Sequence, residues 1–264
     1  MSKGIFTAVS GAIAQSAKLD TVANNLANVN TTGFKRDGQL FREYLTSYNK
    51  EPGAIEAPRV PASIESFYAH NGGDKSYVDL DGTFSDFSQG AVRPTGNNLD
   101  FAIEGDGFFE VATPEGARYT RAGNFSIDGD GRLITKQGYP VQRQGGGEFR
   151  LSGGDLTISA NGEVFDRGQS LGQIALLNIA NKDALMKQGA NLFAFREGLD
   201  PQLAPATEAK VSQGFLEGSN VNVIREMTDM IAATRTFEST QKAIQAYDQM
   251  NGKVVNEVSK LNQG

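Results

Sequence analysis

One serine of this chain matches a catalytic motif. Gly168-Gln-Ser-Leu-Gly172 fits the G-x-S-x-G pattern of a nucleophile elbow letter for letter. That elbow needs a strand, a sharp turn and then a helix, whereas residues 173–179 are typical of a strand. His70 is the only histidine that could serve as its base. We therefore interpret residues 168–172 as a β-turn and His70 as a surface residue.

Acidic residues could bind a metal ion or perform acid–base catalysis. Asp128-Gly-Asp-Gly-Arg132 resembles the start of a calcium loop, but Arg132 stands where an oxygen ligand is required, which favours a hairpin turn. Glu104 and Asp106 are a carboxylate pair of the kind that glycoside hydrolases use. Solvated turn residues are the simpler interpretation. We predict no catalytic residue, no metal and no cofactor.

The composition narrows the chemistry further. The chain has 264 residues, no cysteine and one histidine, which excludes disulfides, thiolate zinc sites and cysteine nucleophiles. Its 25 basic and 31 acidic residues give a net charge of −6, the opposite of what phosphate contacts need, so we predict no nucleic-acid partner. No run of 18 apolar residues occurs, so we predict no membrane-spanning segment.

Glycine and proline divide the chain into three parts. All eight prolines lie between Pro52 and Pro205, and all but four of the 31 glycines lie between Gly33 and Gly218. Because both residue types disfavour helix interiors, this distribution predicts two helical ends around a turn-rich middle. We predict an α+β fold in which long N- and C-terminal helices pair as a coiled coil and bracket a central all-β, hairpin-rich domain.

The N-terminal segment has the spacing of a coiled-coil seam. The residues at alternating intervals of four and three are Ile5, Val9, Ala12, Ser16, Leu19, Ala23 and Leu26. Three of the seven are small, so the seam buries little area. The polar run 28–33 ends in a glycine and is expected to stop the helix. Residues 3–14 imitate a short signal peptide, but we expect them to stay as an uncleaved helix.

The C-terminal segment continues the same spacing for more than four heptads. Its seam residues are Met230, Ala233, Phe237, Thr240, Ile244, Tyr247, Asn251, Val254, Val258 and Leu261. Asn222 is the expected N-cap of this helix. Asn251 would be a polar group on the seam that fixes register. The alternative is that both segments are ordinary amphipathic helices packed on a globular core.

Short β-rich runs separated by turn residues fill the middle of the chain. These runs are 101–103, 107–111, 118–121, 124–127, 132–135, 155–159, 162–165 and 173–179, and a short helix is expected near 183–188. The expected domains are an N-terminal helix over 1–33, an extended linker over 34–69, the β domain over 70–213 and a C-terminal helix over 214–264.

Three stretches of sequence go beyond general patterns. The first is Ala23-Asn-Asn-Leu-Ala-Asn-Val-Asn-Thr-Thr-Gly-Phe-Lys35, the second runs from Thr95 to Phe109 and on to 119–125 and 138–141, and the third runs from 214 to 223 with 235–238. In this order they resemble the bacterial flagellar rod and hook proteins, the axial family of the basal body, over nearly the whole chain. The residues that carry the resemblance are Asn24, Asn25, Asn28, Thr32, Gly33, Phe34, Gly96, Asn97, Gly105, Gly107, Ser219, Asn220 and Val221. Rod relatives often have proline where this chain has Asn98, a difference that concerns the local turn.

The resemblance implies a structural subunit of the flagellar basal-body rod, the drive shaft that transmits motor torque to the hook. It implies assembly with itself and with other rod and hook proteins, and export by the flagellar type III apparatus into the periplasmic space without signal cleavage. Length and a compact central region are more similar to the proximal rod protein than to the distal one. The expected assembly interface is Ile5, Val9, Ala12, Leu19, Ala23, Leu26, Met230, Phe237, Ile244, Tyr247, Val254, Val258 and Leu261.

Two other classes of protein remain open. A carboxylate-dependent hydrolase of cell-wall glycans would hold two acids about 5–10 Å apart in a cleft. A monomeric surface-binding module would pack both helices against the β domain and leave no exposed apolar stripe.

Overall fold

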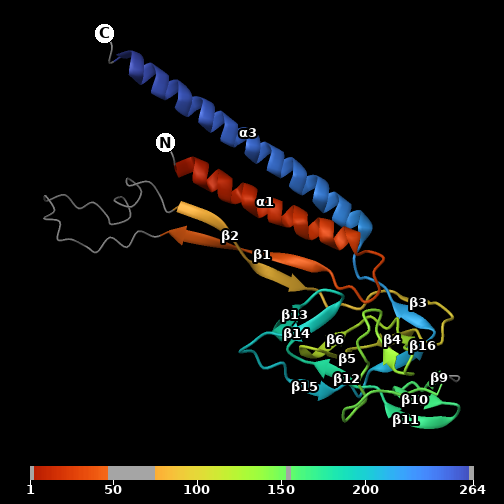
Figure 1. Cartoon of the computed structure of the whole chain (residues 1–264). Helices are drawn as coiled ribbons and strands as arrows, with labels where there is room; N and C mark the ends of the chain where they lie inside the picture. The colour runs from red at the N-terminus through yellow and green to blue at the C-terminus, as the bar shows by residue number, and fades with distance from the viewer. Residues whose placement is uncertain (1–2, 47–74, 153–155, 262–264) are drawn as a thin grey trace, which may run out of the picture. The chain divides into compact units, whose positions relative to one another are not determined.

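The computed structural model describes residues 3–46, 75–152 and 156–261 (Figure 1). The fold is α+β, with a long helix near each end and a mostly β central part, as expected. Contacts divide the chain into two compact units. Unit 1 takes in the described parts of 1–23, 38–83 and 227–264, and unit 2 takes in those of 24–37 and 84–226.

The two long helices are α1 (Lys3–Ala27) and α3 (Val223–Leu261). After α1 ends, Gly33 adopts a φ of 68°, so the predicted stop is confirmed. At the start of α3, the Oδ1 of Asn222 accepts a hydrogen bond of 3.1 Å from the backbone N–H of Arg225, which confirms the predicted N-cap. No helix in the described part of the chain is long and apolar enough to cross a membrane.

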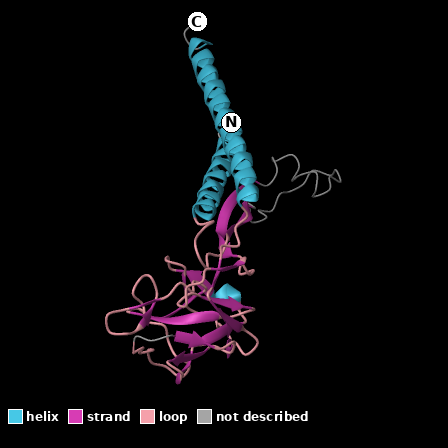
Figure 2. Cartoon of the chain, turned by 90° about the vertical axis from the view of Figure 1, so that its right-hand side faces the viewer, coloured by secondary structure: helices cyan, strands magenta, loops and turns pink. Residues whose placement is uncertain are grey.

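Short strands make up most of the remaining regular structure. They are β1 (Asp37–Thr46), β2 (Lys75–Ser85), β3 (Val92–Pro94), β4 (Phe101–Glu104), β5 (Phe108–Thr113), β6 (Gly116–Thr120), β7 (Ser126–Ile127), β8 (Leu133–Ile134), β9 (Leu156–Ile158), β10 (Glu163–Asp166), β11 (Gln169–Gln173), β12 (Leu176–Ile179), β13 (Leu185–Lys187), β14 (Leu192–Phe195), β15 (Leu203–Pro205), β16 (Lys210–Gln213) and β17 (Phe215–Glu217). In unit 2 the strands β3 to β17 and their loops form one body, which includes the 3₁₀ turn η1 (Lys182–Ala184) (Figure 2).

The largest sheet of unit 2 has the strand order β13-β14-β6-β5-β12-β15, and all its pairings are antiparallel. Smaller sheets are β11-β10-β9, β16-β4, β17-β3 and β7-β8. The large sheet therefore ends in β13 on one side and in β15 on the other. Each of these edge strands has only three residues, and β15 finishes with Pro205.

The core of unit 2 lies on both faces of this sheet. Successive residues of a strand point to opposite faces, so Phe108 and Phe109 on β5 enter two different clusters. Phe109 meets the ring of Phe125 edge to face, with centroids 5.2 Å apart. Phe108 meets Phe193 on the other side at 5.9 Å. Burial on both faces makes β5 the central support of unit 2.

In unit 1, strands β1 and β2 form a two-stranded sheet, and β1 contacts α1. The Nε2 of Gln39 on β1 donates a hydrogen bond of 2.6 Å to the Oγ1 of Thr21 on α1. The sequence analysis expected no strand at 37–46, within the segment 34–69 that it assigned to an extended linker. Residues 47–69 of that segment, and His70, lie outside the described residues.

Two segments of unit 2 also differ from the expected elements. The short helix expected near 183–188 is wrong, because the single turn η1 passes directly into β13, which pairs with β14. Pairing with β14 places Leu185 in the second core cluster, and this tertiary packing overrides the helix propensity of the segment. Residues 215–217, grouped with the C-terminal helix from sequence, form β17 and pair with β3.

Candidate functional site

The residues that match catalytic motifs make structural contacts within the fold. A turn at Arg167 and Gly168 joins β10 to β11. Ser170 lies on β11, so no helix follows it, and its hydroxyl donates to the Oε1 of Glu163 at 2.7 Å. The turn therefore lies at the start of the predicted segment, and the context of a nucleophile elbow is missing.

The acidic motifs have partners within the fold. Asp128 accepts backbone hydrogen bonds from Asp130 and Arg132 and pairs with the Arg132 side chain, which confirms the hairpin turn between β7 and β8. Glu104 accepts from the Ser212 hydroxyl at 2.7 Å. In the part of the chain that the structure describes, no group of three or more His, Cys, Asp or Glu side chains could hold a metal ion.

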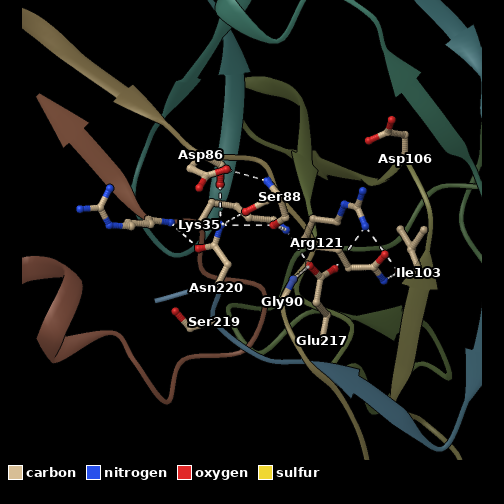
Figure 3. A network of polar contacts seen from close by, with 12 residues as sticks. Lys35, Asp86, Ser88, Gly90, Ile103, Asp106, Arg121, Glu217, Ser219 and Asn220 are labelled. Carbon is tan, nitrogen blue, oxygen red and sulfur yellow. Dashed lines mark hydrogen bonds and ion pairs between the residues drawn. The ribbon is translucent and has the colours of Figure 1, made fainter. Parts of the chain in front are cut away.

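A densely bonded polar site in unit 2 is the buried triad of Lys35, Arg121 and Glu217 (Figure 3). Glu217 on β17 accepts from the Nζ of Lys35 at 2.6 Å and from the Nη1 of Arg121 at 3.2 Å. The backbone N–H of Gly90 donates to the same carboxylate at 2.9 Å. Lys35 also donates to the carbonyl of Ser88 at 2.8 Å. The three charged side chains are at most 3% exposed, so water does not solvate them.

Arg121 ties the triad to the strands of the body. Its Nη2 donates to the carbonyl of Gly105 at 2.7 Å, and its Nη1 also reaches the carbonyl of Ile103 at 3.4 Å. The guanidinium lies over the ring of Phe108, 5.2 Å from its centroid. Burial lowers the pKa of both Arg121 and Lys35, and the neighbouring Glu217 opposes that shift. The carboxylate therefore stabilises the charged forms of the two buried cations.

A second polar cluster lies where the ends of α1 and α3 enter unit 2. The side-chain amide of Asn25 forms two hydrogen bonds with the backbone of Asp37, at 2.8 and 2.9 Å. Its Nδ2 also donates to Glu226 on α3 at 3.2 Å, and Glu226 pairs with the Nε of Arg36 at 2.5 Å. Asn25 and Glu226 are fully buried. This cluster fixes the last turn of α1 to the first turn of α3.

Asn220 completes the link between the N-terminal and C-terminal segments. Its Oδ1 accepts from the backbone N–H of Arg36 at 2.7 Å, and its Nδ2 donates to the carbonyl of Asp86 at 2.8 Å. The same amide reaches the hydroxyl of Ser88 at 3.0 Å. One side chain therefore satisfies backbone groups of two segments, at Arg36 and at Asp86, that are both far from it in sequence.

Gly33 shows why a glycine is needed in the N-terminal segment. Its backbone N–H donates to the carbonyl of Glu217 at 2.8 Å, and its φ of 68° favours glycine. A Cβ at this position would lie 2.4 Å from the backbone N of Ala122. Any other residue would push the chain away from the triad.

The structure brings most of the residues that carry the family resemblance into unit 2. Phe34 is buried under the Nζ of Lys187, 4.0 Å from the ring centroid, and the carbonyl of Thr32 accepts from Asn191 at 2.9 Å. The other residues make local contacts. The side-chain amide of Asn28 donates to the carbonyl of Asn24, that of Asn97 donates to Asp100, and the hydroxyl of Ser219 accepts from the N–H of Val221. Gly96 and Gly105 adopt positive φ, and Gly107 leaves room for the side chain of Ala206.

The seam residues predicted for assembly are not collected into one buried surface. Val9, Ala23 and Tyr247 are exposed. Those that are half-buried are Ile5, Ala12, Leu19, Leu26, Met230, Phe237 and Ile244, and the side chains of Val254, Val258 and Leu261 lie outside the described part. On α1 the side chains that the fold buries are instead Ala14, Val22 and Asn25.

Each long helix also carries large apolar side chains that are exposed. On α1 they are Phe6, Val9 and Ile13, and on α3 they include Ile224, Met227 and Ile231. Both sets have the spacing i, i+3, i+7, which places them on one side of a helix. We call these sets the α1 stripe and the α3 stripe. Their exposure runs from 37% for Val9 to 78% for Ile224.

Sequence reasoning did not single out the charged residues of these clusters. Lys35, Arg121 and Glu217 stand within or beside the quoted motifs, but Lys35 and Glu217 are 182 positions apart. Glu217 follows two apolar residues, Phe215 and Leu216, in a short strand-like run. A charge in such a run indicates a buried carboxylate, which requires a partner of opposite charge. Nothing in the sequence indicated which cations would supply it.

Comparison with known proteins places three parts of the chain in flagellar families. Residues 5–35 match the family described as flagella basal body rod protein, and residues 102–166 match the flagellar hook protein FlgE/F/G D1 domain. Residues 212–257 match the flagellar basal body rod FlgEFG protein C-terminal family. The first and last of these segments supply Lys35 and Glu217, and the middle one supplies Arg121.

Full-length relatives agree with these matches. The flagellar basal-body rod protein FlgG of Bacillus subtilis is 34% identical over 97% of this chain and 99% of its own length. FlgG of Borreliella burgdorferi is 35% identical over 96% of this chain and 97% of its own length, and FlgF of Caulobacter vibrioides is 31% identical over 99% of this chain and all of its own. The chain therefore belongs to the flagellar basal-body rod protein family.

Proposed function

We propose that this chain is a structural subunit of the bacterial flagellar basal-body rod and polymerises through α1 and α3 into the drive shaft that turns the hook. The observation that carries this proposal is the exposure of the α1 and α3 stripes. Large apolar side chains in rows on a helix are a typical contact surface for another helix. Because the chain belongs to the rod family, we expect its neighbours to be copies of the same chain and other rod and hook proteins.

The contact that we propose is helix pairing between neighbouring subunits in the manner of a coiled coil. The predicted seam residues and the two stripes would then bury apolar area that is exposed or half-buried in one chain. Head-to-tail contacts whose rotation does not close generate a helical filament. In the proposed assembly, residues 1–33 and 214–264 form the axial tube, and the β domain within 70–213 surrounds it.

The remaining parts of the proposal concern location and place in the rod. We infer export by the flagellar type III apparatus without a cleaved signal peptide, followed by assembly in the periplasmic space. Chain length and the compact central region support the proximal rod protein first and the distal one second. Immunogold labelling of isolated basal bodies would separate them, because the two positions lie at opposite ends of the rod.

A role without catalysis is also part of the proposal. A general acid of a glycosidase needs a raised pKa, whereas the hydrogen bond from Lys182 lowers the pKa of Asp106. Its would-be partner Glu104 is bonded to Ser212. The exposed stripes also argue against a monomeric surface-binding module, for which no exposed stripe is expected.

Point substitutions on the α3 stripe test the proposal. Ile231→Asp places a charge in the proposed interface and should abolish incorporation into basal bodies and motility, while unit 2 keeps its unfolding transition. Ala232→Asp is the matched control, because Ala232 is also exposed but is turned by about 100° around the helix. Motile cells with normal amounts of the Ile231→Asp chain in their basal bodies would contradict the proposal.

A further inference from the structure

Methionine is the only sulfur-containing residue type of this chain. The sequence has five methionines and no cysteine, so reversible oxidation of sulfur can take place only at a thioether. Among the methionines that the structure describes, Met230 is half-buried, and Met186, Met227 and Met250 are 42%, 49% and 51% exposed. These three side chains are therefore accessible to a small oxidant in the single chain.

Met227 differs from the other exposed methionines because it belongs to the α3 stripe. On a helix, the nearest surface neighbours of a side chain lie three and four positions away in each direction. For Met227 these neighbours are Val223, Ile224, Met230 and Ile231. All four side chains are apolar, and none of them carries an N–H or O–H group that could donate a hydrogen bond. Met227 therefore lies at the centre of an apolar surface.

Met250 lies on the same helix in a different setting. Two of its neighbours at these spacings are Tyr247 and Lys253, whose side chains can donate hydrogen bonds. Met186 lies on β13, outside both long helices. Met227 and Met250 are therefore a matched pair, with similar exposure on one helix and different neighbours.

A peroxide converts the thioether of Met227 into a sulfoxide. A lone pair of Sδ attacks one peroxide oxygen, so that an S–O bond forms and the O–O bond breaks. With hydrogen peroxide, the sulfur loses two electrons, and the departing hydroxide takes the proton of the transferred oxygen and leaves as water. The product carries a polar oxygen that accepts hydrogen bonds, in place of a weakly accepting sulfur.

The sulfoxide has different consequences in the single chain and in a helix contact. In the single chain, water can solvate the new oxygen because Met227 is about half exposed. In a contact made by the α3 stripe, water is removed, and the neighbouring side chains of the helix offer no donor. We therefore expect the oxidised chain to keep its fold and to lose affinity for that contact.

We propose that Met227 is a site of peroxide modification in the unassembled chain, and that its sulfoxide excludes an oxidised subunit from the rod. The inference rests on the proposed function, in which each chain leaves the cytoplasm before the α3 stripe is covered. Exported proteins meet more oxidising conditions than cytoplasmic ones. Methionine sulfoxide reductases reverse the modification, so it is a checkpoint before assembly and not permanent damage.

The first experiment tests the modification on the purified full-length chain. Hydrogen peroxide is added, and mass spectrometry of peptides follows the sulfoxide at each methionine with time. Because their exposures are similar, Met227 and Met250 should oxidise at rates within about twofold of each other, while the circular dichroism spectrum stays unchanged. Oxidation of Met227 that is more than about tenfold slower than that of Met250, or a loss of helical signal as Met227 oxidises, would overturn the inference.

The second experiment tests exclusion from the rod, with glutamine as a polar replacement for the sulfoxide. Glutamine has a helix propensity similar to that of methionine. The amount of Met227→Gln in isolated basal bodies, relative to its amount in the whole culture, should fall about tenfold. Met227→Leu should match the parent chain, because it keeps the stripe apolar. Met250→Gln is the matched control and should stay within about twofold of the parent.

Peroxide itself gives a direct test in cells that express the parent chain and Met227→Leu with different tags. Without peroxide, both chains should enter basal bodies equally. In cultures grown with hydrogen peroxide, the proportion of Met227→Leu in basal bodies should rise with the fraction of Met227 sulfoxide in the unassembled parent chain. Both chains share the same cells, so damage to other flagellar proteins affects them alike. A proportion that peroxide does not change would overturn the inference.

The variants also separate failure of the inference from failure of the proposed function. Equal incorporation of Met227→Gln and the parent chain, or equal losses for Met227→Gln and Met250→Gln, would overturn the inference. If Ile231→Asp is excluded from basal bodies while Met227→Gln is incorporated, the inference alone is wrong. If Ile231→Asp is incorporated normally as well, the proposed function is wrong and the inference with it.

Discussion

The buried triad in unit 2 and the stripes on the two long helices are opposite arrangements, since one buries charged side chains and the other exposes apolar ones. At the triad, charged side chains that are usually solvated are buried and paired with one another. On the stripes, apolar side chains that are usually buried lie in solvent. The triad is complete within one chain, whereas the stripes are the surfaces that we propose for contact with other molecules. We therefore expect stability and assembly to depend on different residues, which can be tested separately.

The largest expected effect is the loss of the carboxylate at the centre of the triad. Glu217→Ala leaves two buried cations without their partner and should lower the free energy of unfolding of unit 2 by about 3–5 kcal/mol. Chemical denaturation monitored by circular dichroism measures this loss. Glu197→Ala, at an exposed position, should change it by less than about 0.5 kcal/mol.

If Glu217→Ala fails to fold, a charge-free triad still tests the same idea. The combined change Lys35→Met, Arg121→Met and Glu217→Leu removes all three charges at once and should be more stable than Glu217→Ala alone. A single Glu217→Ala change that costs less than about 1 kcal/mol would show that the triad is not what joins these segments.

A smaller effect is expected where the backbone comes close to the triad. Gly33→Ala combines a positive φ with a Cβ that would meet backbone atoms, and should cost about 3 kcal/mol in thermal unfolding. Gly96→Ala is the matched control, because Gly96 has a similar φ of 73° with nothing within 4 Å of the added Cβ. Its cost should be about 1 kcal/mol. Equal costs at the two positions would mean that the close approach at Gly33 is unimportant.

The cap of α3 is expected to contribute less again. Asn222→Ala removes the acceptor for the N–H of Arg225 and should destabilise the start of the helix by about 1 kcal/mol, measured by hydrogen exchange of its first amides. Asn222→Asp keeps an acceptor and should retain the parent's protection. Faster exchange in the Asp variant than in the Ala variant would contradict the role of the cap.

The smallest effect concerns a single phenol. Burial, with help from Glu110, raises the pKa of Tyr119 to about 12. An unfolded tyrosine titrates near 10, so the stability linked to Tyr119 is present below about pH 10 and is lost as the pH rises toward 12. The difference in tyrosinate absorbance between the parent chain and Tyr119→Phe should therefore have its titration midpoint near pH 12. A midpoint near 10 would show that the phenol is solvated.

Patterns within a short stretch of sequence were sufficient for some of these features. Heptad spacing and the positions of glycine predicted both helices, and Asn222 was predicted as a cap because the relevant contact is only three residues away. The hairpin turn at Asp128 was predictable for the same reason. Local chemistry determines such features, so they can be read from local sequence.

Features that depend on distant partners could not be predicted in this way. Asn25 was chosen from its motif, but its partner Glu226 is 201 residues away. Residues 183–188 have a helical composition, yet pairing with β14 draws Leu185 into a strand. The strand β1 was missed because residues 47–74 separate it in sequence from its partner β2. In each case tertiary contacts decide the outcome.

The short edge strands of the large sheet have a consequence for a protein that is packed at high density. An open sheet edge can recruit strands from other molecules and start aggregation. Here β13 has three residues and includes Lys187, and β15 has three and ends in Pro205, which lacks an N–H to offer to a new strand. The two edges of the large sheet therefore offer little backbone for a strand of a crowded copy to pair with, which protects the body against growth into a shared sheet.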